Sequence, residues 1–309
     1  MKTKITRHKL LKFINSLIYK WEMSPSIVVY LKNTFFWLFH IRKCILIDGY
    51  LVGFYHKPPK NQNWGDDLNV FLLEKITNKK VLPVKTILLG AFLKRYMVIG
   101  SLVPTFVTRN TVIWGSGVYD LNLPMKNIPR NVLSVRGPLT REYLCKHNVY
   151  CPKTYGDPAL LLPKYYTPRK LVKKKIGLIP HHRDYDLTSL NLNVFMNDED
   201  IRLIDVAHYN ENFYSIIDEI CSCEIILSSS LHGLIVADAY SVKNFFCEFE
   251  YHHPNHDKYL DYYLSVGRKF QKPMLLTEAL SNIHLLIEQP IENIQIDLNE
   301  MLSVMPFKV

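Results

Sequence analysis

The sequence lacks the marks of several large classes of protein. It contains no zinc-finger, RNP or other nucleic-acid-binding motif, so we expect no nucleic-acid partner. Its six cysteines are scattered without metal-ligand spacing and without the density of a disulfide framework. This pattern predicts reduced thiols in a cytoplasmic protein and gives no reason to expect a metal site. The first residues also lack the continuous apolar core and small-residue cleavage site of a signal peptide, so we expect the chain to stay inside the cell.

An uninterrupted transmembrane segment is missing as well. Residues 27–47 are rich in Phe, Leu and Val, but charged residues such as Lys32 and Arg42 interrupt them, which favours an interfacial or core position. Upstream, apolar residues recur at helical spacing through residues 10–21 and are flanked by basic residues. Such a helix either lies on anionic lipid or packs on its own domain. We therefore assign residues 1–42 to a basic, amphipathic N-terminal region that is a candidate for peripheral contact with the inner face of the cell membrane.

The composition is that of a basic globular protein. A length of 309 residues and a hydrophobic fraction of 48% are enough for two domains with packed cores. Lysine and arginine number 38 against 28 aspartate and glutamate residues, which gives a net charge of +10. The surface should therefore attract anions such as phosphorylated small molecules or anionic lipid.

Strand-like and helix-like segments alternate through most of the chain. We expect strands at residues 43–54, 96–99, 111–114, 132–135, 175–179, 202–206, 223–227 and 244–249, and helices at residues 68–76, 140–147 and 212–222. This alternation is typical of βαβ units with parallel sheets. The run PKYYTPRKLVKK combines prolines and charges without apolar periodicity and is the best linker in the chain. The sequence therefore predicts an α/β fold with two Rossmann-like domains facing a cleft: residues 43–163, a linker at 164–174, and residues 175–309 with a C-terminal tail.

The stretch CEIILSSSLHGLIVADAY, residues 223–240, places serines and a histidine between an apolar strand and a helix. Ordinary packing needs only a short turn at such a position. Here Ser229, Ser230 and His232 should lie beside the free N–H groups of the helix, at the carboxyl end of the strand. Open α/β sheets bind anionic ligands at this place.

Other polar residues recur at predicted strand ends. Arg136 in SVRGPLTREYL has a planar guanidinium that suits phosphate or carboxylate, and His181 ends the strand of GLIPHHRD. In NQNWGDDLN, Asp66 and Asp67 stand at a predicted helix start. One of the two can be there simply to cap the helix, without a role in the chemistry. Gly115 in IWGSGV permits either close backbone approach to a ligand or an ordinary turn. The Asp of GDPALLLP is expected to cap a turn.

Taken in order, these stretches resemble the polysaccharide pyruvyl transferase family. The resemblance rests on NWGDDLN, IGSLV followed by VIWGSG, SVRGPLTREYL, GDPALLLP, GLIPHHRD, and CEIILSSSLHGLIVADAY followed by KYLDYYLSVG, and it covers residues 43–270. Each motif is degenerate by itself, but six or seven in this order are specific. Two departures stand out: Ser230 occupies the place of an arginine found in many relatives, and residues 241–244 replace a Gly-x-Pro turn.

The resemblance implies a fold similar to the GT-B glycosyltransferases and an enzyme of surface-glycan or capsule biosynthesis. Such an enzyme moves the pyruvyl group of phosphoenolpyruvate onto two sugar hydroxyls as a cyclic ketal, with the acceptor free or lipid-linked and with no cofactor beyond this co-substrate. His232 matches the family's histidine and is the expected acid/base group, because an imidazole titrates near neutrality.

The remaining site residues follow from the charges of the donor, which carries a phosphate and a carboxylate. Arg136, Ser229 and Ser230 are the first candidates to bind these groups, with His181, Lys258 and Gly115 as further candidates. Asp66 or Asp67 would accept a proton from the acceptor hydroxyl or orient the sugar. We expect no metal ion in this chemistry.

Two other functions remain open at this stage. A GT-B glycosyltransferase that uses a nucleotide sugar would fit the same fold. A membrane-associated scaffold with a decayed site is the non-enzymatic alternative, although the presence of Asp66, Asp67, Arg136 and His232 argues against decay.

Overall fold

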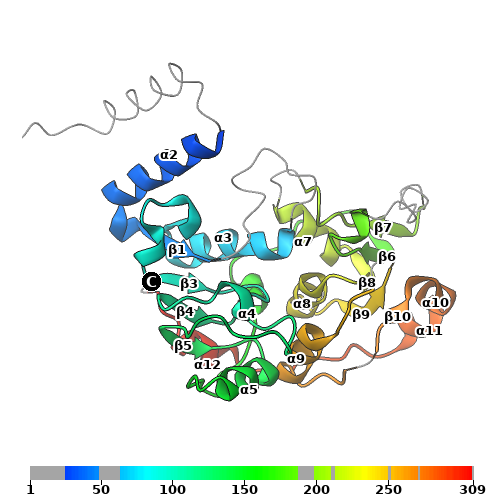
Figure 1. Cartoon of the computed structure of the whole chain (residues 1–309). Coiled ribbons are helices and arrows are strands. Elements are labelled where there is room, and N and C mark those ends of the chain that lie inside the picture. Colours follow the sequence, from blue (N-terminus) through cyan, green and yellow to red (C-terminus); the bar gives the residue numbers. More distant parts are fainter. Residues whose placement is uncertain are drawn as a thin grey trace, which may run out of the picture.

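The computed structural model describes residues 25–48, 63–186, 198–209, 213–249, 252–270 and 272–307 (Figure 1). The amphipathic helix predicted at residues 10–21 lies outside these ranges, as does the second half of the strand predicted at residues 43–54. Among the described helices, none is both long and apolar enough to cross a membrane.

Two parallel five-stranded sheets form the framework of the molecule. The first has the order β2-β1-β3-β4-β5 and the second the order β10-β9-β8-β6-β7. The strands are β1 (Cys44–Ile47), β2 (Lys80–Pro83), β3 (Arg95–Met97), β4 (Thr111–Trp114), β5 (Asn131–Ser134), β6 (Lys174–Ile179), β7 (Ile201–Leu203), β8 (Cys223–Ser228), β9 (Lys243–Glu248) and β10 (Met274–Leu275). Parallel strands need crossover connections, which is why helices alternate with them along the chain.

The helices around the first sheet are α2 (Pro25–Phe39), α3 (Trp64–Thr77), α4 (Val103–Phe106) and α5 (Pro138–Lys146), with short 3₁₀ turns η1 (Ile41–Lys43), η2 (Val84–Thr86), η3 (Gly90–Phe92) and η4 (Pro158–Lys164). Around the second sheet lie η5 (Asp184–Asp186), α7 (Phe213–Cys221), α8 (Leu231–Ala239), α9 (Asp257–Ser265), α10 (Leu276–Ser281) and α11 (Ile283–Glu288). The segment between η4 and β6 joins the two sheets where the linker was predicted. The α/β class with parallel sheets is therefore confirmed.

Most of the expected strands are present, with boundaries shifted by a few residues. Strands β2 and β10 were not predicted, because they contain four and two residues and show no readable alternation. Helix α3 begins at Trp64 rather than after a polar loop, so Asp66 and Asp67 lie inside its first turn. Carboxylates are favoured there by the helix dipole.

The last helix, α12 (Leu298–Ser303), returns to the first sheet, where Figure 1 shows it below β5. The Trp114 indole nitrogen donates to the Met301 carbonyl at 3.0 Å. The Phe307 ring packs edge-on against Tyr96 and Trp114, with centroid distances of 4.7 and 5.8 Å. The tail that follows the second sheet along the chain therefore packs on the first half. Hydrophobic contacts of high sequence separation of this kind leave no local pattern.

The two halves share one continuous hydrophobic core and meet closely at helices α5 and α9. The core includes Trp64 and Leu72 of α3 together with Ile226 and Leu234 of the second half. At Gly137, just before α5, a Cβ atom would lie 2.0 Å from the Asp261 carbonyl oxygen of α9. Only glycine allows this approach.

Replacing Gly137 with alanine should therefore destabilise the junction between the halves. We expect the substitution Gly137→Ala to lower the free energy of unfolding by about 1–3 kcal/mol, because the added methyl group forces helix α9 away. Urea denaturation followed by circular dichroism measures this change. Lys146→Ala, at an exposed position of the same helix, is the matched control and should change stability by less than about 0.5 kcal/mol. Equal stability of both variants and the parent would contradict the close contact.

Candidate active site

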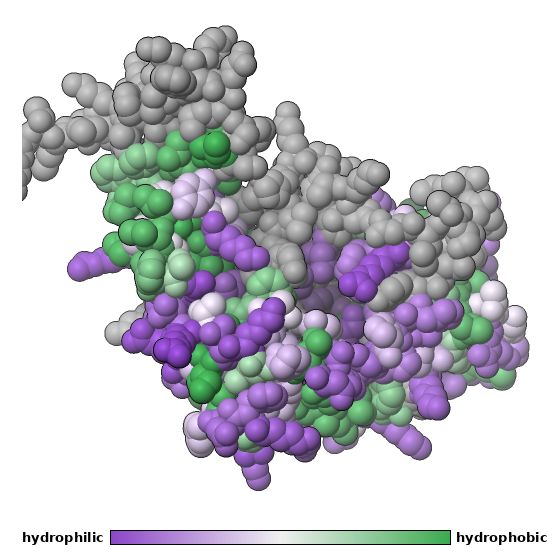
Figure 2. Space-filling view, in the orientation of Figure 1, coloured by the Kyte–Doolittle hydropathy of each residue, from purple (hydrophilic) through white to green (hydrophobic). Residues whose placement is uncertain are grey.

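A cleft of 540 Å³ lies between the two sheets. Its walls carry Ser101 after β3, His181 after β6 and Ser230 after β8, so the carboxyl ends of strands from both sheets meet there. Figure 2 shows a hollow between the two halves. In parallel α/β sheets ligands bind at this edge.

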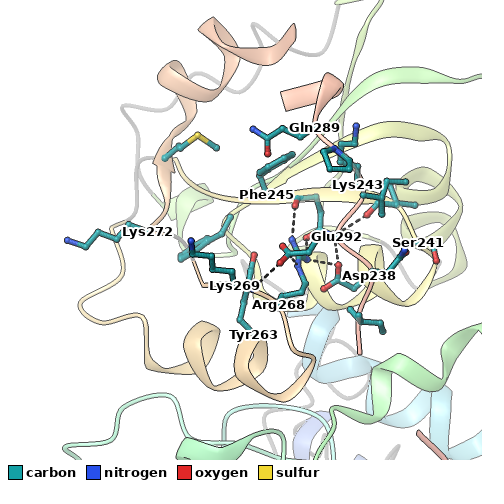
Figure 3. A pocket seen from close by; sticks show the side chains of 18 residues that line it. Asp238, Ser241, Lys243, Phe245, Tyr263, Arg268, Lys269, Lys272, Gln289 and Glu292 are labelled. Carbon is teal, nitrogen blue, oxygen red and sulfur yellow. Dashed lines mark hydrogen bonds and ion pairs between the residues drawn. The ribbon is translucent and has the colours of Figure 1, made fainter. Parts of the chain in front are cut away.

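A second cavity, of 430 Å³, lies beside β9 and is shown in Figure 3. Its central cation, Arg268, is already neutralised by internal partners: Nη1 donates to Asp238 at 2.5 Å and to Asn244 at 2.9 Å, and Nε donates to Glu292 at 3.3 Å. These contacts fasten the C-terminal segment to β9 and α8. We therefore place the candidate active site in the larger cleft.

His232 lies in the first turn of α8 and is 7% exposed. Its Nε2 atom is 3.9 Å from Oδ2 of Asp157, and neither atom has a hydrogen-bond partner within the described part of the chain. The other oxygen of Asp157 accepts from the Ala159 amide at 3.0 Å, which confirms the predicted cap. Asp157 thus caps η4 with one oxygen and faces the imidazole with the other.

The His232 imidazole is neutral at ordinary pH. Burial is the main cause that lowers its pKa, to about 3, and the positive charges of Arg136 and Lys258 add to the effect. An uncharged imidazole is able to accept a proton.

Gly65 allows α3 to lie directly against this histidine. A Cβ atom at Gly65 would be 2.0 Å from Nδ1 of His232, so any side chain there would displace the imidazole. In the structure Gly65 is a helical residue that is needed for close approach.

Asp66 points into the cleft, whereas Asp67 points away from it. Asp66 accepts from Asn63 Nδ2 at 2.8 Å, and burial followed by the charge of Asp67 raises its pKa to about 7. Asp67 is fully buried and accepts a hydrogen bond from the Tyr209 hydroxyl. Of the two predicted carboxylates, only Asp66 lines the site, and Asp67 ties α3 to the segment after β7.

Lys258, near the start of α9, also lines the cleft. Burial is the main cause that lowers its pKa to about 7, with Arg136 adding to the lowering and Asp66 opposing it. The ammonium group lies 4.9 Å from the Tyr259 ring centroid. Lys258 is therefore a cleft cation that responds to the charge of whatever binds beside it.

Arg136 lies behind the wall of the cleft rather than in it. Its side chain is fully buried and pairs with Asp261 of α9 at 3.3 Å. Its Nη1 donates to Ser101 Oγ at 2.5 Å, and Nη2 donates to the Val118 carbonyl. Only Ser101 of this group reaches the cleft. The guanidinium therefore joins the two halves, and Arg136, predicted to bind the donor, is not part of the cleft lining.

Of the other predicted donor-binding residues, some line the cleft and some are buried behind its wall. Ser230 and His181 line the cleft. Ser229 is fully buried, where its hydroxyl accepts from the His181 amide at 2.7 Å and donates to Asp184 at 2.9 Å. Gly115 has φ of +94°, and a Cβ there would lie 2.2 Å from Pro158 Cδ. The close approach of Gly115 is made to Pro158 and not to the cleft. Gly115 and Ser229 therefore both shape the site from behind its wall.

Sequence reasoning missed two groups at the site. Asp157 was expected only as a cap, and its contact with His232 joins segments 75 residues apart, a separation that no local pattern shows. His253 packs edge-on against His181 with ring centroids 4.7 Å apart, and the Tyr259 hydroxyl lies 2.8 Å from its Nε2 atom. The run YHHPNHDK that holds it was the available signal. Among the described residues, no group of three or more His, Cys, Asp or Glu side chains is placed to hold a metal ion.

These features define an α/β protein whose two parallel sheets share one polar cleft with a buried histidine, a carboxylate and a lysine. The family model for polysaccharide pyruvyl transferase matches residues 30–250. The chain therefore belongs to the polysaccharide pyruvyl transferase family, as the resemblance of its motifs predicted.

Two individual relatives are similar to part of this chain. The succinoglycan biosynthesis protein ExoV of Rhizobium meliloti is 31% identical over 198 residues, which cover 61% of this chain and 57% of that protein. An uncharacterized protein of Acanthamoeba polyphaga mimivirus is 28% identical over 186 residues, 59% of this chain and 63% of the relative. The matches thus span about three fifths of the length of these relatives. A crystal structure of a functionally uncharacterized Klebsiella pneumoniae protein aligns with a TM-score of 0.39 and 14% identity over 76% of this chain and 93% of that one, too low a score to support an argument.

The buried carboxyl of Asp66 makes the stability of the protein depend on pH. Because its pKa is raised from 3.8 to about 7, the folded state holds a proton between these values that the unfolded state has lost. Stability contributed by Asp66 is therefore full at low pH and decreases as pH rises toward 7. The substitution Asp66→Asn removes this loss. We expect the variant to gain about 2–4 kcal/mol over the parent between pH 4 and pH 8.

Urea denaturation at pH 4, 6 and 8 measures this difference. Glu224→Gln, at an exposed position on β8, is the matched control and should shift stability by the same small amount at each pH. A difference between Asp66→Asn and the parent that does not change with pH would contradict the raised pKa.

Proposed function

We propose that this protein transfers the pyruvyl group of phosphoenolpyruvate onto two hydroxyls of a sugar, in a surface polysaccharide or its precursor, as a cyclic ketal. Membership of the polysaccharide pyruvyl transferase family supports pyruvyl transfer to a polysaccharide. The observation that carries the assignment of the site is the convergence of His232, Asp66 and Lys258 in one cleft. No cofactor beyond the co-substrate takes part in this proposal.

The two parallel sheets with a cleft between them also support a GT-B-like arrangement of two Rossmann-like domains. In such an arrangement each half contributes one side of the site. Asp66 and Ser101 come from the first half, and His232 and Lys258 from the second. Donor and acceptor would then meet where the halves meet.

The reaction needs balanced proton transfers. The methylene carbon of phosphoenolpyruvate gains one proton, and a sugar hydroxyl adds to the neighbouring carbon as its own proton leaves. The carbon–oxygen bond to phosphate then breaks, and a second hydroxyl attacks the same carbon to close the ketal. The two sugar hydroxyls release two protons. One balances the proton that the methylene carbon gains, and the other leaves with inorganic phosphate.

Lys258, Ser230 and the N-terminus of α8 are the groups we assign to the anionic donor. Helix N-terminal N–H groups and an ammonium both favour phosphate. Lys258 would supply the positive charge that many relatives draw from an arginine at the position of Ser230. A bound phosphate beside Lys258 would also raise the pKa of its ammonium and keep it charged. His181 borders the same part of the cleft.

His232 and Asp66 are the groups we assign to proton transfer. The neutral imidazole of His232 would accept the hydroxyl proton, and Asp157 on its far side would stabilise the imidazolium that forms. Asp66, with a pKa of about 7, is protonated in a large fraction of molecules at neutral pH and would donate to the methylene carbon. Partial burial of both groups keeps competing water away from them.

The acceptor would lie across the first-half side of the cleft. Tyr119, Phe106 and Leu102 line that side, and Tyr119 is 41% exposed. An aromatic ring combined with a few polar groups suits the apolar faces and the hydroxyls of a sugar. We place this reaction in the cytoplasm, where phosphoenolpyruvate is made.

Donor identity is tested by thermal unfolding with phosphoenolpyruvate and, in parallel, with UDP- and GDP-sugars. Phosphoenolpyruvate at a hundred times its dissociation constant should stabilise the folded protein by about 2.7 kcal/mol and raise the midpoint by several degrees. The variant Lys258→Gln should lose most of this shift, because the ammonium that pairs with the phosphate is gone. Lys153→Gln, an exposed lysine outside the cleft lining, should keep it. A shift with a nucleotide sugar alone would replace the proposal with a glycosyltransferase.

The role of His232 is tested by the substitution His232→Gln. We expect the rate of phosphate release with a competent sugar acceptor to fall by about 10²–10⁴-fold, because the imidazole assigned to accept the hydroxyl proton is gone. Phosphate release and ketal formation, followed by NMR of the new methyl group, measure the rate. His284→Gln, on the exposed side of α11, should be unaffected. Undiminished turnover in a folded His232 variant would overturn the assignment.

A further inference from the structure

Helix α2 leaves large apolar side chains exposed, in contrast to the usual surface helix. Of its side chains from Ile27 to Phe39, only Thr34 is buried. Thr34 Oγ1 accepts from the Leu88 amide at 2.9 Å, and Asn33 Nδ2 donates to Thr86 Oγ1 at 2.9 Å. These hydrogen bonds hold the helix to the protein together with Phe36 and Trp37, which are partly buried against the apolar cluster of β1, β2 and η2. Ile27, Leu38 and Phe39 of the same helix are exposed. A helix in water normally buries the apolar side.

The segment after η2 adds further exposed apolar side chains beside this helix. Leu88, Leu89 and Phe92 are 55%, 66% and 76% exposed. Leu89 has φ of +58°, a conformation unfavourable for a leucine, and the Phe92 amide donates to its carbonyl at 3.0 Å. The chain is thus held in a strained turn that leaves three large side chains outside.

These residues form one apolar face on the first half of the molecule. We define it by the exposed side chains Ile27, Leu38, Phe39, Ile41, Leu88, Leu89 and Phe92. Figure 2 shows the hydrophobic residues gathered over α2 and the part of the first half next to it. Large contiguous apolar surfaces on soluble domains mark sites of interaction with proteins or membranes.

The charges around the apolar face have one sign. Lys32, Arg42, Lys43, Lys85 and Lys94 are all exposed in the segments that build it. Residues 25–47 and 75–119 contain no aspartate or glutamate. A protein partner would meet only positive charge around an apolar centre, whereas an anionic bilayer presents phosphates at its surface and hydrocarbon beneath. Apolar side chains surrounded by lysine and arginine match this arrangement of surface phosphates and underlying hydrocarbon.

We propose that the apolar face is a docking surface for the anionic phospholipid of a membrane. Ile27, Leu38, Phe39, Leu88, Leu89 and Phe92 enter the boundary between headgroups and acyl chains, and the surrounding lysines and arginines contact lipid phosphates. Helix α2 has 15 residues and lies in the membrane surface without crossing it. The inference is independent of the chemistry of the cleft, since it uses only residues of α2, η1 and the segment 84–94.

Flotation of the full-length protein with vesicles tests the proposal. Vesicles of phosphatidylglycerol and phosphatidylcholine should carry the protein upward, and pure phosphatidylcholine should carry little. The double variant Leu88→Ser with Phe92→Ser should bind anionic vesicles about tenfold or more weakly, because two apolar side chains no longer enter the membrane. Raising the salt concentration to 1 M should weaken binding by the parent through screening of the basic residues.

The matched control is the double variant Ile128→Ser with Val172→Ser, which removes two exposed apolar side chains elsewhere on the surface, 58% and 77% exposed. It should float like the parent. Three outcomes overturn the proposal: no flotation of the parent, equal flotation of both double variants, or equal binding to neutral and anionic vesicles.

Two alternative occupants of the apolar face have their own signatures. If a second copy of the chain covers it, sedimentation velocity without lipid shows a dimer that Leu88→Ser with Phe92→Ser dissociates. If another part of the same chain covers it, that variant lowers the thermal midpoint without changing flotation. Either result refutes membrane docking, and neither bears on phosphoenolpyruvate binding, which is measured separately.

Discussion

The buried ion pair between Arg136 and Asp261 is the contact on which the arrangement of the two halves depends. Its atoms lie 3.3 Å apart with almost no exposure, and both Asp261 oxygens also accept from Thr140, at 3.0 and 2.7 Å. Removing one partner of such a pair leaves an uncompensated charge in the interior, a loss of about 3–5 kcal/mol. The same guanidinium holds Ser101 at the wall of the cleft. One arginine thus both joins the halves and contributes to the positive potential that keeps His232 neutral.

The cleft combines groups whose charges respond to each other. Burial moves the pKa of Asp66 up and that of Lys258 down, each to about 7, and that of His232 to about 3. At neutral pH these three groups therefore carry little net charge, which limits the cost of closing the cleft off from water. An anionic ligand would reverse part of this balance, since it favours the protonated forms of the lysine and the histidine. Ligand binding and proton binding are consequently linked at this site.

The extent of prediction differed between the fold and the site. The α/β class and most strands followed from apolar runs such as the one before Ser228, because burial in a parallel sheet selects such residues on both faces. Membership of the family followed from the order of degenerate motifs. The site was predicted only in part: His232, Asp66, Ser230, His181 and Lys258 line the cleft, whereas Arg136, Asp67, Ser229 and Gly115 lie behind it. All nine stand at strand ends, helix starts or turns, and local sequence does not tell which side of a wall such a residue occupies.

The sequence by itself determined the local elements, the excess of positive charge and the chemical groups that reach the strand ends. Periodicity, turn residues and motif order act over a few residues, so they can be read directly. Only the tertiary structure decided that Asp157 faces His232, that α12 returns to the first sheet, and that α2 leaves Ile27, Leu38 and Phe39 exposed. These facts arise from contacts between segments far apart in the chain, whose energies depend on packing and burial that exist only once both halves have folded together.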